Sequence, residues 1–272
     1  MTLKGLLKQA TAEAPRAEGL AVSAAAMLLD LPVHKASISQ LRDPGPGAGL
    51  PTAVAADLQE GRLLPVGSVE FVRAAMAIAG ITEPDNLSYP KPLRHLLKRD
   101  LFQLAAGQVV GTWFVKPMRT KTFTGFVFDT MADPITLCEH DQEQHAAFLG
   151  MGAAETVWVS EPVTFLSEWR YYVHQDRVLG CARYDPEGSD GAPHPDAAIL
   201  AESVRAMREI GVAACAIDLG VLDSGETALV EVNDAWALGL CGRALAPSQY
   251  LTMLRDRWVQ MLAPTSGQSD CA

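Results

Sequence analysis

Three oxygen-bearing side chains, Asp218, Glu231 and Asn233, lie in two apolar segments near the C-terminal end of the sequence. Side chains of a strand alternate between its two faces, so Glu231 and Asn233 of the segment ALVEVND should point to the same side. The Asp-Ser-Gly between the two segments is typical of a hairpin turn, which would bring Asp218 beside them. Carboxylate and amide oxygens are the ligands that Mg²⁺ prefers, so the pattern predicts a metal site. Solvent-facing polar residues of an amphipathic hairpin are the alternative.

A magnesium site of this kind usually shares its ion with nucleotide phosphates, which predicts a lysine upstream. Lys116 ends the apolar segment VVGTWFVKP, where an unpaired charge is costly. The polar turn that follows, MRTKTFTG, could surround phosphates with backbone N–H groups and with Lys121. A surface lysine at the end of a strand is the alternative.

The composition narrows the classes of protein to which the chain can belong. With 272 residues it can form one large domain or two closely joined ones. Its net charge of −10 argues against a general nucleic-acid binder, which needs a surplus of Lys and Arg. We expect neither a membrane span nor a secretory signal, because the apolar runs are short and interrupted. The five cysteines are scattered and form no CxxC pair, which argues against a zinc site or disulfide framework and favours the cytoplasm.

The order of predicted elements divides the chain near residue 92. Residues 1–92 are expected to form a small mixed unit, with a Pro/Gly loop at 42–51, a strand before Gly67, a helix over 69–78 and a linker at 83–92. A helix is expected over 93–107, and further helices over 195–211 and 247–262. The expected strands lie at 109–117, 124–130, 155–163, 167–173, 177–185, 214–222 and 226–234.

Residues 93 to 243 resemble the ATP-grasp superfamily of carboxylate–amine ligases. FVKPMRTKTFTG is similar to the phosphate loop of D-alanine–D-alanine ligases, and VSEPVTFLSEWRYYV resembles the hinge and ribose segment of the family. SEWRYYVHQDRVLGCAR is similar to the Asp-Ile-Arg…Arg segment of RimK-type ligases, and AIDLGVLDSGETALVEVND matches the metal module. The resemblance implies an α+β ATP-grasp fold at 93–264, in which two small subdomains hold ATP. A short mixed α/β unit at 1–92 would precede it, and a flexible tail would follow at 265–272.

The same resemblance implies roles for individual residues. Those implied to bind ATP are Lys116, Lys121, Thr122 and Thr124 at the phosphates, Glu161, Pro162 and Val163 at the adenine, and Glu168 at the ribose. Those implied to hold Mg²⁺, as two ions, are Asp218, Glu231 and Asn233. Arg170 and Arg183, expected on adjacent strands, would stabilise the γ-phosphate, the acyl-phosphate or the substrate carboxylate. Arg99, His174 and Arg243 are secondary candidates.

Two departures from the family pattern leave the substrate open. The phosphate loop carries Lys, Thr and Phe where relatives often have Gly and Ser, and the turn after Asn233 reads Asp-Ala-Trp-Ala-Leu-Gly instead of a Ser-Pro-Gly type. The expected activity is ATP- and Mg²⁺-dependent amide formation through an acyl-phosphate, from a small-molecule or peptide carboxylate and an amine. A kinase or phosphotransferase on the same fold and a non-catalytic nucleotide-binding module are the alternatives. No nucleic acid or membrane partner is expected, and a homodimer or a substrate-carrying partner protein stays open.

Overall fold

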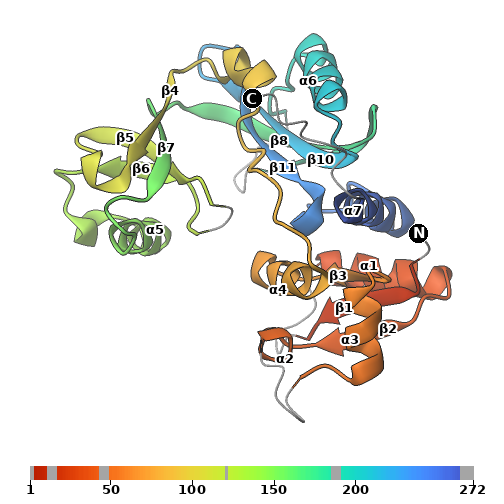
Figure 1. Ribbon diagram of the computed structural model, residues 1–272. Coiled ribbons are helices and arrows are strands. Elements are labelled where there is room, and N and C mark those ends of the chain that lie inside the picture. The colour runs from red at the N-terminus through yellow and green to blue at the C-terminus, as the bar shows by residue number, and fades with distance from the viewer. Residues whose placement is uncertain (1–2, 11–16, 43–48, 120–121, 185–190, 264–272) are drawn as a thin grey trace, which may run out of the picture.

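The computed structural model of the chain describes residues 3–10, 17–42, 49–119, 122–184 and 191–263. Within these ranges the strands form three sheets, one of three strands and two of four (Figure 1). Helices pack on each sheet, so the expected α+β architecture is confirmed.

The N-terminal unit is built on a parallel sheet. Its central strand β1 (Gly5–Gln9) pairs with β2 (Val33–Ala36) on one side and with β3 (Leu63–Val66) on the other. The helices of the unit are α1 (Ala17–Leu28), α2 (Ile38–Arg42), α3 (Thr52–Gln59) and α4 (Val69–Ala79). The side chain of Ser68 accepts a hydrogen bond from the Phe71 N–H at the start of α4, and Gly80 ends the helix with φ 68°. The predicted strand, turn and helix are thereby confirmed.

The second sheet is antiparallel and has the strand order β4-β7-β5-β6. These strands are β4 (Leu101–Ala105), β7 (Thr156–Ser160), β5 (Thr112–Pro117) and β6 (Phe126–Asp129). The helix α5 (Glu139–Leu149) packs on one face, where a cluster of buried side chains includes Val115, Phe126 and Phe148. Side chains alternate along β5, so Lys116 faces away from α5 together with its cross-strand neighbour Trp158.

The third sheet, of order β11-β10-β8-β9, is also antiparallel. It comprises β8 (Phe165–His174), β9 (Arg177–Arg183), β10 (Ala214–Leu222) and β11 (Thr227–Asp234). One face packs against α6 (Ala197–Ile210) and the 3-10 helix η1 (Lys91–Leu97), through a cluster that contains Cys215, Ile217 and Leu219. Alternate residues of β10 therefore point to the other face, and Asp218 is among them.

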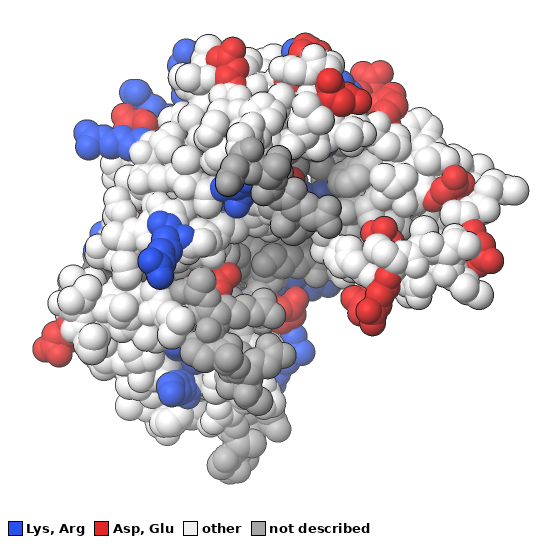
Figure 2. Space-filling model, turned by 180° about the vertical axis from the view of Figure 1, so that it is seen from behind, with Lys and Arg blue, Asp and Glu red and all other residues white. Residues whose placement is uncertain are grey.

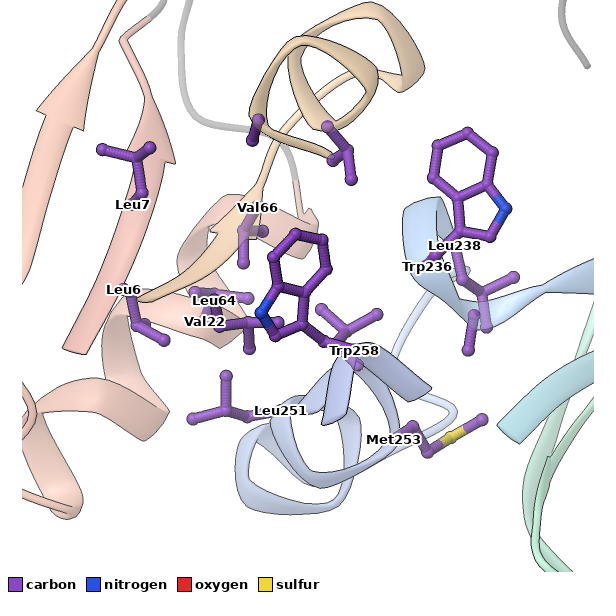
Figure 3. Packing of buried hydrophobic residues seen from close by; sticks show 14 of the residues in the cluster. Leu6, Leu7, Val22, Leu64, Val66, Trp236, Leu238, Leu251, Met253 and Trp258 are labelled. Atoms are coloured by element: carbon purple, nitrogen blue, oxygen red, sulfur yellow. The ribbon is translucent and has the colours of Figure 1, made fainter. Parts of the chain in front are cut away.

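The helix α7 (Pro247–Leu262) joins the N-terminal unit to the third sheet. It lies between the two in Figure 1, and its Trp258 and Leu251 pack among Val22 and Leu64 of the N-terminal unit (Figure 3). The same cluster includes Tyr172 of β8. The chain passes from the N-terminal unit to the rest near residue 92, but the largest core includes side chains from both sides of this boundary.

Most predicted elements of the C-terminal region are confirmed, including α7 over residues 247–262 and α6 with its N-cap Asp196. The predicted helix over 93–107 is wrong: η1 stops at Leu97 because Lys98 adopts a left-handed conformation with φ 57°. β4 follows there and pairs with β7. The strand expected from residue 109 begins at Thr112, after Gly111 with φ 97°, and α5 was not predicted. The predicted tail at 265–272 and most of the loop at 42–51 lie outside the described residues.

Candidate functional site

An acidic cluster lies on the face of the third sheet that turns away from α6. Asp218 of β10 is directly opposite Glu231 of β11, and its side chain is fully buried. The Asn233 amide Nδ2 donates hydrogen bonds to Asp218 Oδ2 and to Glu231 Oε1, both at 2.9 Å. The predicted proximity of these three side chains is confirmed, because the hairpin turn and the alternation of the strand act within one short segment.

Arg170 of β8 is the cation that neutralises Asp218. Its Nε donates to Asp218 Oδ1 at 2.8 Å and its Nη2 to Oδ2 at 2.6 Å, with Nη2 also 3.9 Å from Glu231 Oε1. Burial acts to lower the pKa of Arg170, but the hydrogen bonds and charge of Asp218 outweigh it and raise the pKa above its usual range. Two-pronged pairing of this kind fixes the plane of the guanidinium group.

Lys116 reaches the acidic cluster from the second sheet. Its Nζ donates to Glu231 Oε2, so the predicted phosphate lysine and a predicted metal ligand are in direct contact. The pKa of Lys116 is lowered to about 8, first because burial removes the ammonium group from water, while Asp218 opposes the shift. The ring of Tyr89 lies 5.2 Å from Nζ. The strand β5 thus places a positive charge over β11, between two sheets that are otherwise separate.

Arg99 adds a second cation near Lys116. Its positive charge contributes to the lowered pKa of Lys116, and its guanidinium carbon lies 5.8 Å from the centroid of the Phe114 ring. The Nε and Nη1 atoms of Arg99 are buried and have no hydrogen-bond partner among the described residues. Buried donors without an acceptor are costly, so these atoms fit an anionic ligand such as phosphate. The sequence indicated Arg99 only as a secondary candidate.

The predicted phosphate turn is described in part. Thr122 and Thr124 are exposed, while Phe123 between them is buried against Phe126 and Phe148. The backbone N–H of Thr124 donates to Gln144 Oε1 at 2.6 Å, which ties the turn to α5. Lys121 lies outside the described residues. The packing of Phe123 therefore accounts for the Phe that departs from the family pattern.

The predicted adenine segment borders a cavity of about 530 Å³, whose lining includes Arg99, Glu161 and Val163. Pro162 is exposed between the two lining residues of this segment. The Glu161 carboxylate accepts a hydrogen bond from the backbone N–H of Asp100 at 3.1 Å, so one of its oxygens is already engaged. The segment therefore lies at the junction with the start of β4.

Glu168, predicted at the ribose, is two residues from Arg170 on β8, so it shares a sheet face with Arg170. Its charge acts to raise the pKa of Lys116, which places it near the same cluster. The ribose candidate and the phosphate and metal candidates thus occupy one continuous face of the third sheet.

Three predicted residues do not join the cluster. Arg183 is opposite Trp169 in the register, one residue out of step with Arg170, so its side chain leaves the other face of the sheet. His174 pairs with Asp256 of α7 at 2.8 Å. Arg243 is exposed in the turn at 242–243. The expectation that Arg170 and Arg183 act side by side is corrected: their strands are adjacent, but the period of two separates their side chains.

Two aromatic residues near the site were not predicted. Tyr89 contacts Trp158 edge-on, with ring centroids 5.5 Å apart, and lies over Lys116. Tyr184 lies over Arg170, with its ring centroid 3.9 Å from the guanidinium carbon. No spacing rule points to either residue, because each belongs to an irregular segment and meets its partner only through the tertiary fold.

The donors of the cluster fit Mg²⁺ only if other groups complete its coordination. Among the described residues, no three His, Cys, Asp or Glu side chains are grouped to hold a metal. Two carboxylates and one amide supply oxygen, whereas Mg²⁺ takes six ligands and usually obtains the rest from water and phosphates. The donor set therefore fits an ion shared with a nucleotide. None of the described helices is long and apolar enough to cross a membrane.

Comparison with known proteins is consistent with this arrangement. The profile of a family described as an ATP-grasp domain, the second family of its clade, matches residues 94–253. Among solved structures, the ATP-grasp ligase PsnB with a minimal precursor has a TM-score of 0.50 and 12% identity, over 94% of this chain and 99% of that one. The D-alanine–D-alanine ligase of Bacillus anthracis has the same TM-score and identity, over 96% and 99%. No curated protein matches the sequence.

Proposed function

This chain belongs to the ATP-grasp family, and from that membership we propose that it is an ATP- and Mg²⁺-dependent carboxylate–amine ligase. One observation carries the proposal. Lys116 of one sheet meets Glu231 of the other, directly beside the Arg170–Asp218 pair. Cations that attract phosphate and oxygens that attract Mg²⁺ are thus together between two sheets.

ATP would lie between the second and third sheets, in the hollow that separates the two lobes in Figure 2. Lys116 and Arg99 would bind the phosphates, together with the turn at Thr122 and Thr124. The segment 161–163 would border the adenine and Glu168 the ribose. Acidic side chains predominate on the outside of the lobe built on the second sheet (Figure 2), so the cations of the site are the local exception.

The proposed reaction has two steps. A carboxylate oxygen of the substrate attacks the γ-phosphorus of ATP, the bond to ADP breaks, and an acyl-phosphate forms. An amine then attacks the acyl carbon and loses a proton, and phosphate leaves with the amide as product. When bound to Asp218, Glu231 and Asn233, Mg²⁺ would neutralise phosphate charge.

The protein itself supplies position and charge in this scheme. Lys116 exchanges Glu231 for a phosphate oxygen, which frees the carboxylate for the metal. Arg170, held by Asp218, stabilises the negative charge that develops on the transferred group. These groups are fixed before the substrate arrives, so little reorganisation is needed during the reaction.

A screen of ADP release tests the proposal. The protein is incubated with ATP, Mg²⁺ and sets of amino acids, peptides and small acids, with and without amines, and products are identified by mass spectrometry. A ligase requires both an acid and an amine for full ADP release and gives an amide. ADP release with a phosphorylated product and no need for an amine would indicate the kinase alternative. ATP binding without turnover across the screen would indicate a nucleotide-binding module.

A further inference from the structure

The guanidinium group of Arg170 is held in two different ways. Its edge donates the two hydrogen bonds to Asp218, while its face is covered by the ring of Tyr184 at 3.9 Å from the guanidinium carbon to the ring centroid. An arginine within about 6 Å of a ring centroid interacts favourably with the electrons of the ring. The Asp218 contact fixes the position of the group in its plane, and Tyr184 restricts movement out of that plane.

Tyr184 is itself fixed to the strand that carries Arg170. It follows β9 directly, and its backbone N–H donates to the carbonyl oxygen of Glu168 on β8 at 2.8 Å. Glu168 is two residues before Arg170, on the same face of the sheet. The ring is therefore positioned by the β8–β9 ladder.

The exposure of the two side chains differs sharply. Tyr184 is 44% exposed, whereas the side chain of Arg170 is 6% exposed and that of Asp218 is fully buried. Tyr184 thus lies between the Arg170–Asp218 pair and solvent. Burial raises the pKa of the Tyr184 phenol, while the Arg170 charge opposes the shift, so the ring stays neutral at neutral pH.

We propose that Tyr184 is a positioning residue, whose ring keeps the Arg170 guanidinium group oriented and shielded from water for phosphoryl transfer. The inference rests on the proposed function. It assigns the effect to the face of the ring and not to the phenol oxygen. A charge that is shielded from water and held in place stabilises a transition state more strongly than a mobile, hydrated one.

Replacement of Tyr184 separates the ring from the hydroxyl group. In Tyr184→Leu, kcat for ADP release should fall about three- to thirtyfold, the factor that a cation–π contact represents. The KM for ATP should change less than about twofold, because Lys116 and Arg99 hold the phosphates. Tyr184→Phe should restore kcat to within about twofold of the original protein. Tyr184→Met serves as a second non-aromatic variant if the Leu variant folds poorly.

Phe102→Leu is the matched control. Phe102 is 45% exposed, like Tyr184, but it belongs to β4 and shares its sheet face with Val159, away from Lys116. It should retain the kcat of the original protein. An equal fall of kcat in Tyr184→Leu and Phe102→Leu would overturn the inference, and so would an equal loss in Tyr184→Phe and Tyr184→Leu.

A double-mutant cycle tests whether Tyr184 acts through Arg170. In an Arg170→Ala background, measured by product accumulation over long incubations, Tyr184→Leu should have no further effect on the rate. The same fold-loss in both backgrounds would overturn the inference. If the original protein shows acid- and amine-dependent turnover and Tyr184→Leu matches it, the inference fails while the proposed function stands.

A measurement without turnover addresses the contact directly. The ring should shift the Arg170 Nε–H proton upfield in the NMR spectrum of the arginine-labelled protein, with the assignment made from Arg170→Lys. Tyr184→Leu should remove the upfield shift and Tyr184→Phe should keep it. An unchanged resonance in Tyr184→Leu would overturn the inference, whatever the activity screen gives.

Discussion

The Lys116 ammonium group of β5 forms an ion pair with the Glu231 carboxylate of β11, across 115 residues of sequence. It is a contact between two sheets that belong to different cores, since Val115 lies in the cluster under α5 and Val232 in the cluster under α6. The Lys116 side chain is 16% exposed and that of Glu231 is 21% exposed. This pair links the predicted phosphate and metal sites and motivates the first two predictions.

Lys116→Ala should weaken ATP binding. A charge-assisted contact to phosphate contributes about 1.5–3 kcal/mol, so the affinity should fall about ten- to a hundredfold in calorimetry. Lys4→Ala is the control, because Lys4 also forms an ion pair, with Asp57, but lies in the N-terminal unit. Equal ATP affinity in the original protein and Lys116→Ala would contradict the role of the lysine.

Glu231→Gln and Asp218→Asn should both abolish turnover, but they should differ in stability. Asp218→Asn leaves the Arg170 charge buried without a carboxylate, which costs about 3–5 kcal/mol in the free energy of unfolding. Glu231→Gln should cost much less, because Glu231 is partly exposed and Asp218 still neutralises Arg170. Chemical denaturation measures the difference. Near-original ADP production by either variant at saturating Mg²⁺ would show that the metal assignment is wrong.

Arg99→Met should lower ATP affinity without lowering stability. The buried Nε and Nη1 atoms of Arg99 have no acceptor among the described residues, and each such group costs about 1–3 kcal/mol. Their removal should leave the melting temperature unchanged or raise it, while calorimetry shows weaker ATP binding. Arg255→Met, at an arginine whose side chain is 47% exposed, is the control. A large loss of stability in Arg99→Met would mean that the guanidinium group serves the fold.

ATP with Mg²⁺ should raise the melting temperature through selective binding to the folded protein. At a hundredfold excess over the dissociation constant the gain is about 2.7 kcal/mol. EDTA should remove most of it, because the phosphates then lack the ion that joins them to Asp218 and Glu231. Thermal denaturation with each ligand alone and with both together measures the effect. An identical gain with and without EDTA would argue against a metal-dependent site.

Trp258→Ala should destabilise the whole protein. Trp258 is 1% exposed and packs in the core that joins α7 to the N-terminal unit, so the cavity should cost about 3–5 kcal/mol. Trp113→Ala, at a partly buried tryptophan of β5, is the control. Because the core is shared, unfolding should remain one transition. A separate, early transition of the N-terminal unit would show that residues 1–92 are independent.

Local chemistry explains which parts of the fold could be predicted from the sequence. The hairpin of β10 and β11 is close in sequence, so alternation and one turn were enough to place Asp218 beside Glu231 and Asn233. The helices α6 and α7 carry their own signals, Asp196 as N-cap of the first and Pro247 at the start of the second. The resemblance to the ATP-grasp family, now supported by the match over residues 94–253, supplied the remaining order of elements.

Packing across long distances in sequence decided the rest. Lys98 in a left-handed conformation and the pairing with β7 turned a predicted helix into η1 and β4. The register of β8 and β9 separated Arg183 from Arg170, and the tertiary fold brought Tyr184 over Arg170. Periodicity and capping act over a few neighbouring residues, so they fix an element and its faces. Which face of one sheet meets which side chain of another depends on the burial of all of them at once, and only the folded chain determines it.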